Sequence, residues 1–294
     1  MEKKILVPIT PSDVNKEVIH RADIWGQRTG AEIRFLHVRS IVNPLDINFS
    51  FGGMTADKDY EELEKYLQSQ NLKSKYSIAV RTGIIYSQII EEENSFEPDL
   101  IIMAAHSHTA IARLFLGSNT DYTIHHCRCP VFVFKATMEP EGNNIIVPLD
   151  YSDVNKRVIS IADEWANRTN SQLHFVHVAL PPGDAHYSGN YVWIKDNIGN
   201  LDERRQFERI KNLSLEEKQK LESYISDFDL KSSYALSIKF GKPYLCVLDL
   251  QKELKANMIV MATHSHTLLN RIFVGSNTNY LLHHTNCSMF IYKG

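Results

Sequence analysis

The sequence predicts an α/β fold in two tandem domains, each a doubly wound parallel sheet with helices on both faces. The first observation behind this prediction is an internal repeat. "KKILVPITPSDV" at 3–14 returns as "NNIIVPLDYSDV" at 143–154, and "MAAHSHTAIARLFLGSNTDYTIHH" at 103–126 returns as "MATHSHTLLNRIFVGSNTNYLLHH" at 261–284. A repeat this long indicates duplicated domains rather than a solenoid of small units. The second observation is that each copy alternates short apolar runs with helix-periodic segments, the pattern of β-α-β units with right-handed crossovers.

The first strand and helix of each half are predicted from an apolar run followed by an apolar stripe. "KILVPI" suits a buried parallel strand. Apolar residues then recur at helical spacing, so one face of a helix packs on the sheet. The stripe consists of Val14, Val18, Ala22 and Trp25 in the first half and Val154, Val158, Ala162 and Trp165 in the second. We expect Ser12 and Ser152 to cap these two helices.

The remaining elements of the first half follow in the same alternation. "EIRFLHV" predicts a second strand, and a charged segment with Leu63, Tyr66 and Leu67 predicts a second helix. "YSIAV" predicts a third strand, followed by a helix around 85–93. The fully apolar "DLIIMAA" is typical of a strand at the centre of a sheet. A helix beginning near Ser118 and the strand "PVFVF" complete the half.

The repeat also sets the domain boundaries. We expect the first domain to span 1–138 and the second 143–294, with a short linker between them. The two copies are offset by about 140 residues at their starts and by about 158 later, so the second carries a net insertion of about 18 residues within 178–220. We expect this insertion to be a loop with an extra helical turn or two, serving either as a solvated surface or as a lid.

Composition excludes several classes of protein. The 294 residues carry a formal net charge of −3, and no basic stripe suggests nucleic acid as a partner. No apolar run approaches the roughly 20 residues of a membrane span, and the start "MEKKILVPIT" does not resemble a secretory signal. The four cysteines form no C-x-x-C pair and are interpreted as reduced thiols. We therefore expect a cytoplasmic protein that binds neither nucleic acid nor membrane.

The repeated "GSNT" at 117–120 and 275–278 is a candidate phosphate cradle. A helix that begins after a strand offers free backbone N–H groups and the positive end of its dipole to an anion. Glycine lets the backbone approach the anion closely, and the serine, asparagine and threonine side chains add donors. The alternative interpretation is a plain helix start with a serine cap.

The whole chain resembles a tandem universal stress protein, with two such domains in one polypeptide. Nucleotide-binding members of that family carry G-x-x-G, nine residues, then G-[ST], and an aspartate after the first strand in a "VP-x-D" context. The four motif positions hold Ala104, Ser107, Gly117 and Ser118 in the first half and Ala262, Ser265, Gly275 and Ser276 in the second, with the nine-residue gap intact. The resemblance implies a Rossmann-like, adenine nucleotide alpha hydrolase-like fold. It also implies ATP or AMP as the ligand, with Mg²⁺ as an accompanying ion.

The two halves depart from the family motif in different ways. Both replace the first two glycines by alanine and serine, which adds bulk near the ligand but keeps a hydroxyl that can donate to phosphate. The aspartate position holds Thr10 in the first half and Asp150 in the second. Because threonine offers no charged acceptor, the resemblance implies that the C-terminal half binds nucleotide better.

The nucleotide-binding residues that the resemblance implies fall in two matching sets. In the second half they are Pro148, Asp150, Val178, Ala262, His264, Ser265, His266, Gly275, Ser276, Asn277 and Thr278. Weaker contributions come from the corresponding first-half residues Pro8, Thr10, Val38, Ala104, His106, Ser107, His108, Gly117, Ser118, Asn119 and Thr120.

The histidine pairs raise a metal-binding alternative. His106 with His108, and His264 with His266, stand at i and i+2, where two imidazoles of an extended segment could share a zinc ion. The adjacent pairs at 125–126 and 283–284 lie at the far end of a predicted helix, where neighbouring residues diverge by about 100°. We favour phosphate-facing or hydrogen-bonding roles for the H-x-H histidines and keep zinc as the alternative.

Catalytic signals are weak in this sequence. It has no G-x-x-x-x-G-K-[ST] loop, and no carboxylate in the motif is placed to ready a water for attack on a γ-phosphate. We therefore expect a held nucleotide, at most slow hydrolysis, and no catalytic residue. A nucleotide-free interaction or scaffold protein and a slow nucleotide hydrolase or metal-binding variant stay as alternatives.

The resemblance also implies an assembly. In the family, domains pair through the last strand, so "PVFVF" and "SMFIY" are expected to pair within the chain as a pseudo-twofold dimer. Two chains can then assemble further into a homodimer. A protein partner is expected, but its identity is not encoded in these motifs.

Overall fold

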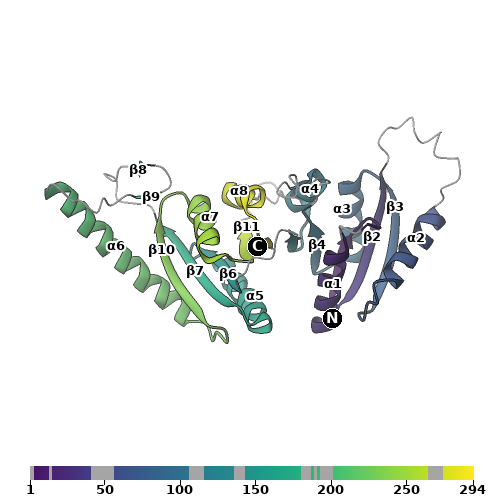
Figure 1. The fold of residues 1–294 in the computed structure, drawn as a ribbon, viewed down its shortest axis with the longest axis horizontal. Helices are drawn as coiled ribbons and strands as arrows, with labels where there is room; N and C mark the ends of the chain where they lie inside the picture. Colours follow the sequence, from purple (N-terminus) through teal and green to yellow (C-terminus); the bar gives the residue numbers. More distant parts are fainter. Residues whose placement is uncertain are drawn as a thin grey trace. The chain divides into compact units, whose positions relative to one another are not determined.

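The computed structural model describes residues 3–12, 15–40, 56–105, 116–135, 143–179, 187–188, 191–192, 201–263 and 274–294 (Figure 1). They form two compact units, the first built mainly from the first half of the chain and the second mainly from the second half. Each unit is an α/β sheet covered by helices, as the repeat predicts.

The first unit has five parallel strands in the order β5-β4-β1-β2-β3. Because β1→β2→β3 and β3→β4→β5 cross in opposite directions, right-handed crossovers place α1 and α2 on one face and α3 and α4 on the other. The elements are β1 Lys4–Pro8, α1 Lys16–Thr29, β2 Glu32–Ser40, α2 Ala56–Gln68, β3 Tyr76–Gly83, α3 Ile85–Phe96, β4 Leu100–Ala104, α4 Ser118–His126 and β5 Val131–Phe134.

The second unit repeats this arrangement, with β10-β7-β6-β11 in the places of β3-β2-β1-β4. In Figure 1, α6 runs beside β10, as α2 does beside β3. The elements are β6 Asn144–Leu149, α5 Asp153–Thr169, β7 Gln172–Ala179, β8 Tyr187–Ser188, β9 Tyr191–Val192, α6 Leu201–Ser226, β10 Tyr234–Phe240, α7 Pro243–Leu254, β11 Met258–Thr263, α8 Ser276–His284 and β12 Ser288–Lys293.

The core of each unit is the apolar sheet with the helix stripes packed on it. Strands β4 and β11 are buried along their whole lengths, which is why they read as continuous apolar runs. The stripe residues Val18, Ala22, Val158 and Ala162 are fully buried, so the helical periodicity identified the packed faces correctly.

The helix caps differ from the sequence expectation. Helix α1 begins at Lys16 with Asn15 at its N-cap, so the prediction that Ser12 caps it is wrong. Ser152 does occupy the N-cap of α5, but its side chain makes no capping bond there. Its hydroxyl donates instead to Asp150 Oδ1 at 2.6 Å. The Ser152 hydroxyl therefore bonds to the carboxylate two residues before it, and not to a backbone N–H group of the helix.

The described part of the insertion is more helical than expected. It includes two short antiparallel strands, β8 and β9, and α6 has 26 residues where α2 has 13. The helix is therefore longer than a loop with an extra turn or two implies. In the part of the chain that is described, no helix has both the length and the apolar character to cross a membrane. The predicted pairing of the two closing strands would join the two units, and it stays a prediction.

Candidate functional site

The described residues of the predicted site lie at the carboxyl edge of each sheet. Strand β1 lies between β2 and β4, so the chain reverses its direction of travel at the β1/β4 boundary, and β6 and β11 repeat this. Parallel α/β sheets bind ligands outside the strand ends at such a boundary. Thr10 follows the end of β1 next to the end of β4 at Ala104. Asp150 follows β6 in the same way, next to the end of β11.

Helices α4 and α8 begin at this edge, at the predicted residues. Gly117 and Gly275 are their N-cap residues, and Ser118 and Ser276 open the helices. The first intrahelical bonds are Asp121 N–H to Gly117 O and Asn279 N–H to Gly275 O, each 2.9 Å. The N–H groups of 118–120 and 276–278 therefore precede the helical ladder and form the positive end of each helix dipole.

Gly275 is not explained by the fold of the second unit. Its φ of −59° and ψ of 153° are open to any residue. A Cβ atom added there would meet no atom of the described residues within 4 Å. Neither its backbone conformation nor its packing against the described residues demands a glycine, whereas a ligand lying against the backbone would.

Two of the predicted cradle residues, Thr120 and Thr278, have buried side chains. The Thr120 hydroxyl donates to Ala104 O at 3.1 Å and ties the start of α4 to the end of β4. Thr120 and Thr278 are both buried. Their contribution to a ligand would therefore come from their backbone N–H groups. Ala104 and Ala262 are buried as well, so their methyl groups lie largely among protein atoms.

Asp150 organises the turn between β6 and α5. Its Oδ1 accepts hydrogen bonds from Ser152 N–H at 3.1 Å, Ser152 Oγ at 2.6 Å and Asn155 Nδ2 at 2.5 Å. This is an aspartate-anchored turn that holds the carboxylate at the strand end. The same residue thus supplies negative charge at the edge and shapes the local backbone.

Two side chains that the motif search did not single out fix the same edge in both units. His37 Nδ1 lies 3.2 Å from Ile9 O, and His177 Nδ1 lies 2.8 Å from Leu149 O. Because a carbonyl only accepts, Nδ1 carries the proton, and each imidazole clamps two strand ends together. The sequence indicates this role through the repeat, because a histidine stands at the matching position of both halves, in "LHV" and in "VHV".

Tyr151 gives the second unit a feature that the first lacks. It follows Asp150 with a left-handed φ of 62°, whereas the matching Pro11 cannot adopt a positive φ. Its ring centroid lies 4.5 Å from that of His177 and 5.4 Å from that of Tyr224. Burial, followed by the nearby Glu217 carboxylate, raises the pKa of Tyr151 to about 12.

The adjacent histidines at the ends of α4 and α8 are held by their own helices. His126 Nδ1 bonds to Tyr122 O at 2.8 Å, and its ring stacks on the Tyr122 ring with centroids 3.7 Å apart. His284 repeats both contacts with Tyr280. His125 Nδ1 bonds to Asp121 O at 2.8 Å. Among the described residues, no group of three or more His, Cys, Asp or Glu is placed to hold a metal ion.

Part of the predicted site belongs to segments that the structure does not describe. Six residues of the glycine-motif segments lie outside the described residues: His106, Ser107, His108, His264, Ser265 and His266. The described parts of the predicted site are the strand ends, with Pro8, Val38, Pro148 and Val178 partly exposed there, and the two helix starts.

The four cysteines form no disulfide, and three of them are buried. The buried ones are Cys127, Cys246 and Cys287. Burial raises the pKa of Cys127 to about 12 and also raises that of Cys129 and Cys246. A thiolate nucleophile is therefore disfavoured at these positions.

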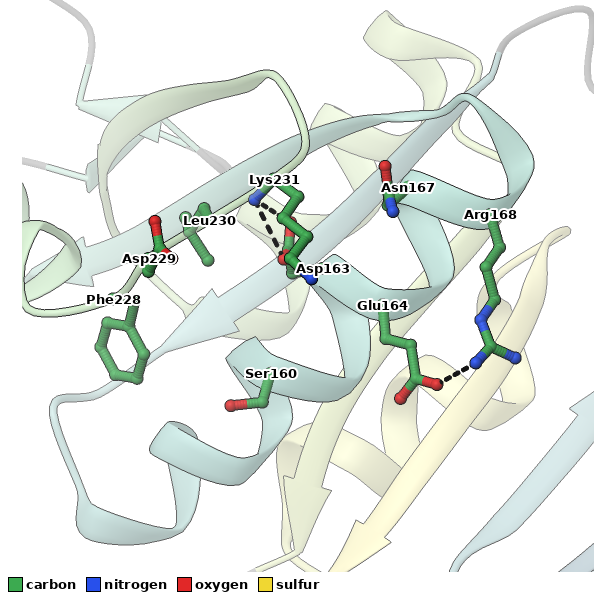
Figure 2. Close-up of a pocket in the computed structure, with 9 residues that line it drawn as sticks. All are labelled: Ser160, Asp163, Glu164, Asn167, Arg168, Phe228, Asp229, Leu230 and Lys231. Atoms are coloured by element: carbon green, nitrogen blue, oxygen red, sulfur yellow. Dashed lines mark hydrogen bonds and ion pairs between the residues drawn. The ribbon is translucent and has the colours of Figure 1, made fainter. Parts of the chain in front are cut away.

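A separate hollow of about 450 Å³ lies between α5 and the segment 228–231 (Figure 2). Its central carboxylate, Asp163, accepts N–H bonds from Lys231 and Ser232. Figure 2 also shows Glu164 paired with Arg168 on the same helix. Because the hollow precedes β10, it lies at the amino edge of the sheet and contains none of the predicted site residues.

Comparison with known proteins gives a consistent family. The model of the universal stress protein family matches residues 1–135 and again 142–293. "Universal stress protein E" of Photorhabdus laumondii is 21% identical over 99% of this chain and 95% of its own length. The protein of that name from Escherichia coli K12 is 20% identical over 100% and 94%.

Solved structures share the whole architecture. A universal stress protein from Archaeoglobus fulgidus superposes with a TM-score of 0.65 at 18% identity, over 99% of this chain and 98% of the other. A Pseudomonas aeruginosa chain described as a universal stress protein gives a TM-score of 0.67 at 17% identity, over 99% and 93%. At these identities the likeness concerns the fold.

Proposed function

Because this chain belongs to the universal stress protein family, whose model matches both of its halves, we propose that it is a stress-response module that holds an adenine nucleotide. The ligand is ATP or AMP, and the second half binds it more tightly than the first. The protein acts in the cytoplasm, where its four cysteines, which form no disulfide, stay reduced.

The observation that carries the proposal is Gly275. A glycine that neither φ nor packing requires stands at the start of a helix. An anion bound there would receive the free N–H groups of 276–278 and the helix dipole. The phosphates of a nucleotide are the ligand groups that match this arrangement.

The orientation of the nucleotide follows from the sheet edge. With the phosphates on α8, beside the end of β11, the sugar lies toward the neighbouring end of β6, where Asp150 stands. A carboxylate is a strong acceptor for ribose hydroxyls. The base then extends toward the end of β7 and Val178. The first half has the same layout but holds Thr10 in place of the carboxylate.

The described groups favour binding of the nucleotide over its hydrolysis. Backbone N–H donors neutralise phosphate charge, but they do not activate a water molecule. Asp150 stands at the sugar end, with one carboxylate oxygen engaged by Ser152 and Asn155. The module therefore reports nucleotide occupancy to a protein partner, and any hydrolysis is slow.

The test is calorimetry with ATP and AMP on the full chain and on two matched variants, Gly275→Val and Gly117→Val. A Cβ at Gly275 meets no atom of the described residues within 4 Å, so circular dichroism and thermal unfolding of Gly275→Val should match the wild type while the tighter site is lost. Gly117→Val should remove only the weaker site. No heat of binding at millimolar ATP would overturn the proposal in favour of a nucleotide-free interaction protein. Rapid release of ADP would favour a hydrolase, and stoichiometric zinc by mass spectrometry would favour the metal-binding variant.

A further inference from the structure

Asn15 and Asn155 occupy the same position in the two halves, and their surroundings differ. Both are buried, with exposed fractions of 1% and 3%. Both stand where the first helix of their unit begins, five residues after the position that holds Thr10 or Asp150. Asn155 donates from Nδ2 to the Asp150 carboxylate at 2.5 Å. In the first half the position that matches Asp150 holds Thr10, which has no carboxylate.

The orientation of the Asn15 amide is fixed by its neighbours. Nδ2 lies 2.6 Å from Thr10 O and 3.2 Å from Ser12 Oγ. A flipped amide would set its oxygen against a carbonyl oxygen, and two acceptors repel, so the NH₂ group must face Thr10.

This orientation leaves Asn15 Oδ1 unsatisfied. The atom is buried and has no hydrogen-bond partner among the described residues. A buried carbonyl without a donor costs about 1–3 kcal/mol, so such atoms call for an explanation in a native protein. The matching Asn155 differs in its surroundings, because its Nδ2 donates to a carboxylate instead of a main-chain carbonyl.

We propose that Asn15 Oδ1 is the acceptor for a ribose hydroxyl in the first half, where it replaces the carboxylate that Asp150 supplies in the second. This inference rests on the proposed nucleotide function. With phosphates at the start of α4, beside the end of β4, the sugar lies toward the end of β1, and Asn15 bonds to Thr10 at that end. An orphan acceptor calls for a donor. The donors of an adenine nucleotide are its ribose hydroxyls and the 6-amino group of the base, and in this orientation the hydroxyls are the donors that lie toward the end of β1.

The first half therefore has an acceptor for the ribose hydroxyl in spite of the missing aspartate. Thr10 offers no charged acceptor, but the neighbouring Asn15 offers a neutral one. A hydrogen bond to a neutral group contributes less than one to a charged group. The first half therefore binds the same sugar more weakly, and its recognition of the hydroxyl depends on a residue outside the family motif.

The experiment isolates the first site in the full chain by working in the Gly275→Val background. Calorimetry compares ATP with its 2′-deoxy and 3′-deoxy analogues, before and after Asn15→Ala. With Asn15 present, loss of one hydroxyl should weaken binding by about 3- to 10-fold, the equivalent of one net hydrogen bond. In Asn15→Ala that preference should disappear, so the two changes should be coupled in the double-mutant cycle. The matched control is Asn155→Ala in the Gly117→Val background, which should keep the preference because Asp150 remains.

Each outcome has a separate meaning. A hydroxyl preference that survives Asn15→Ala would overturn the inference, because Oδ1 would then be satisfied by water alone. Binding in the Gly117→Val chain with none in the Gly275→Val chain would also overturn it, while leaving the proposed function intact. Binding in neither chain would overturn the proposed function itself. If Asn15→Ala unfolds, Asn15→Asp keeps an acceptor without the donor, and it should retain the hydroxyl preference.

Discussion

The side chain of Asn155 donates a hydrogen bond to Asp150 across 2.5 Å, and with the Ser152 contacts it fixes the turn that leaves β6. The aspartate that the family motif assigns to a ligand therefore also has a structural task. The proposed ligand binding and the structure of the turn both depend on the Asp150 carboxylate at the end of β6. Substitutions at Asp150 should consequently affect stability and nucleotide binding together, but to different degrees.

The first prediction separates these two tasks. Asp150→Ala removes an acceptor of three hydrogen bonds at the start of α5, so unfolding of the chain in urea should show a loss of about 1–2 kcal/mol. Asp150→Asn keeps an acceptor oxygen and should recover most of that stability. It loses the negative charge, so the affinity for ATP in the second half should still fall. Equal stability of the alanine variant and the wild type would show that the turn does not depend on the carboxylate.

The second prediction restores the carboxylate in the first half. In Thr10→Asp, the new side chain can accept from Asn15 Nδ2, as Asp150 does from Asn155. We expect a gain in stability of about 0.5–1.5 kcal/mol and tighter ATP binding in a Gly275→Val background. Thr10→Asn is the matched control, because it adds a similar side chain without the charge. A loss of stability in the aspartate variant would show that the turn at Thr10 does not accommodate a carboxylate as the turn at Asp150 does.

The contrast between these turns marks the limit of sequence reasoning here. Helices α4 and α8 begin at the residues expected from "GSNT", because the start of a helix is signalled by neighbouring residues. The buried strands and stripes were likewise readable, because burial on one face leaves a period in the sequence. The contacts of Asn15, His37 and Tyr151 left no such period. These contacts depend on residues that the turns and the sheet bring together from separate parts of the sequence. The sequence indicates them only through the comparison of the two halves, which shows whether the same residue stands at the matching position.

Ser12 and Ser152 illustrate the same limit at a helix start. Both fit the composition of an N-cap, yet α1 begins at Lys16, and the Ser152 hydroxyl turns back to Asp150. Local preference names the residue types that can cap a helix. The geometry at the end of the preceding strand determines which group the serine hydroxyl bonds to.

The third prediction concerns Tyr151, whose hydroxyl is buried without a hydrogen-bond partner among the described residues. Tyr151→Phe keeps the ring between His177 and Tyr224 and removes the unsatisfied group, so the variant should be as stable as the wild type or more stable by about 1 kcal/mol. Tyr151→Ala loses the ring contacts and should be destabilised. A marked loss of stability in the phenylalanine variant would reveal a partner for the hydroxyl.

Alkaline pH offers a second measurement at Tyr151. Its pKa is raised from 10.0 to about 12 by burial and then by Glu217, so the folded state favours the protonated hydroxyl. The stabilisation linked to this shift is fully present below pH 10.0 and is lost as pH rises toward about 12. Wild type should therefore lose stability relative to Tyr151→Phe across that interval. Parallel curves for the two proteins would contradict the shift.

The last prediction concerns Asp23, a buried carboxylate on α1 that anchors the segment before β3. Asp23 Oδ1 accepts N–H bonds from Lys73 at 3.1 Å and Ser74 at 2.8 Å, and Oδ2 accepts from Gln27 Nε2 at 2.8 Å. Asp163 makes the matching main-chain contacts in the second unit. Desolvation by burial raises the pKa of Asp23, but the bonds from Ser74, Lys73 and Gln27 outweigh it, and the net shift is downward from 3.8.

The sign of this shift fixes the expected pH dependence. A carboxyl group with a lowered folded pKa contributes stability above its unfolded pKa of 3.8, and that contribution is lost as pH falls through the folded value. Asp23→Ala should therefore be less stable than the wild type by about 1–3 kcal/mol at neutral pH. The gap should narrow in urea titrations carried out below pH 3.8. Asp23→Asn is the matched control, because it keeps an acceptor without the titration. A gap that stays constant with pH would show that the main-chain bonds do not depend on the charge of Asp23.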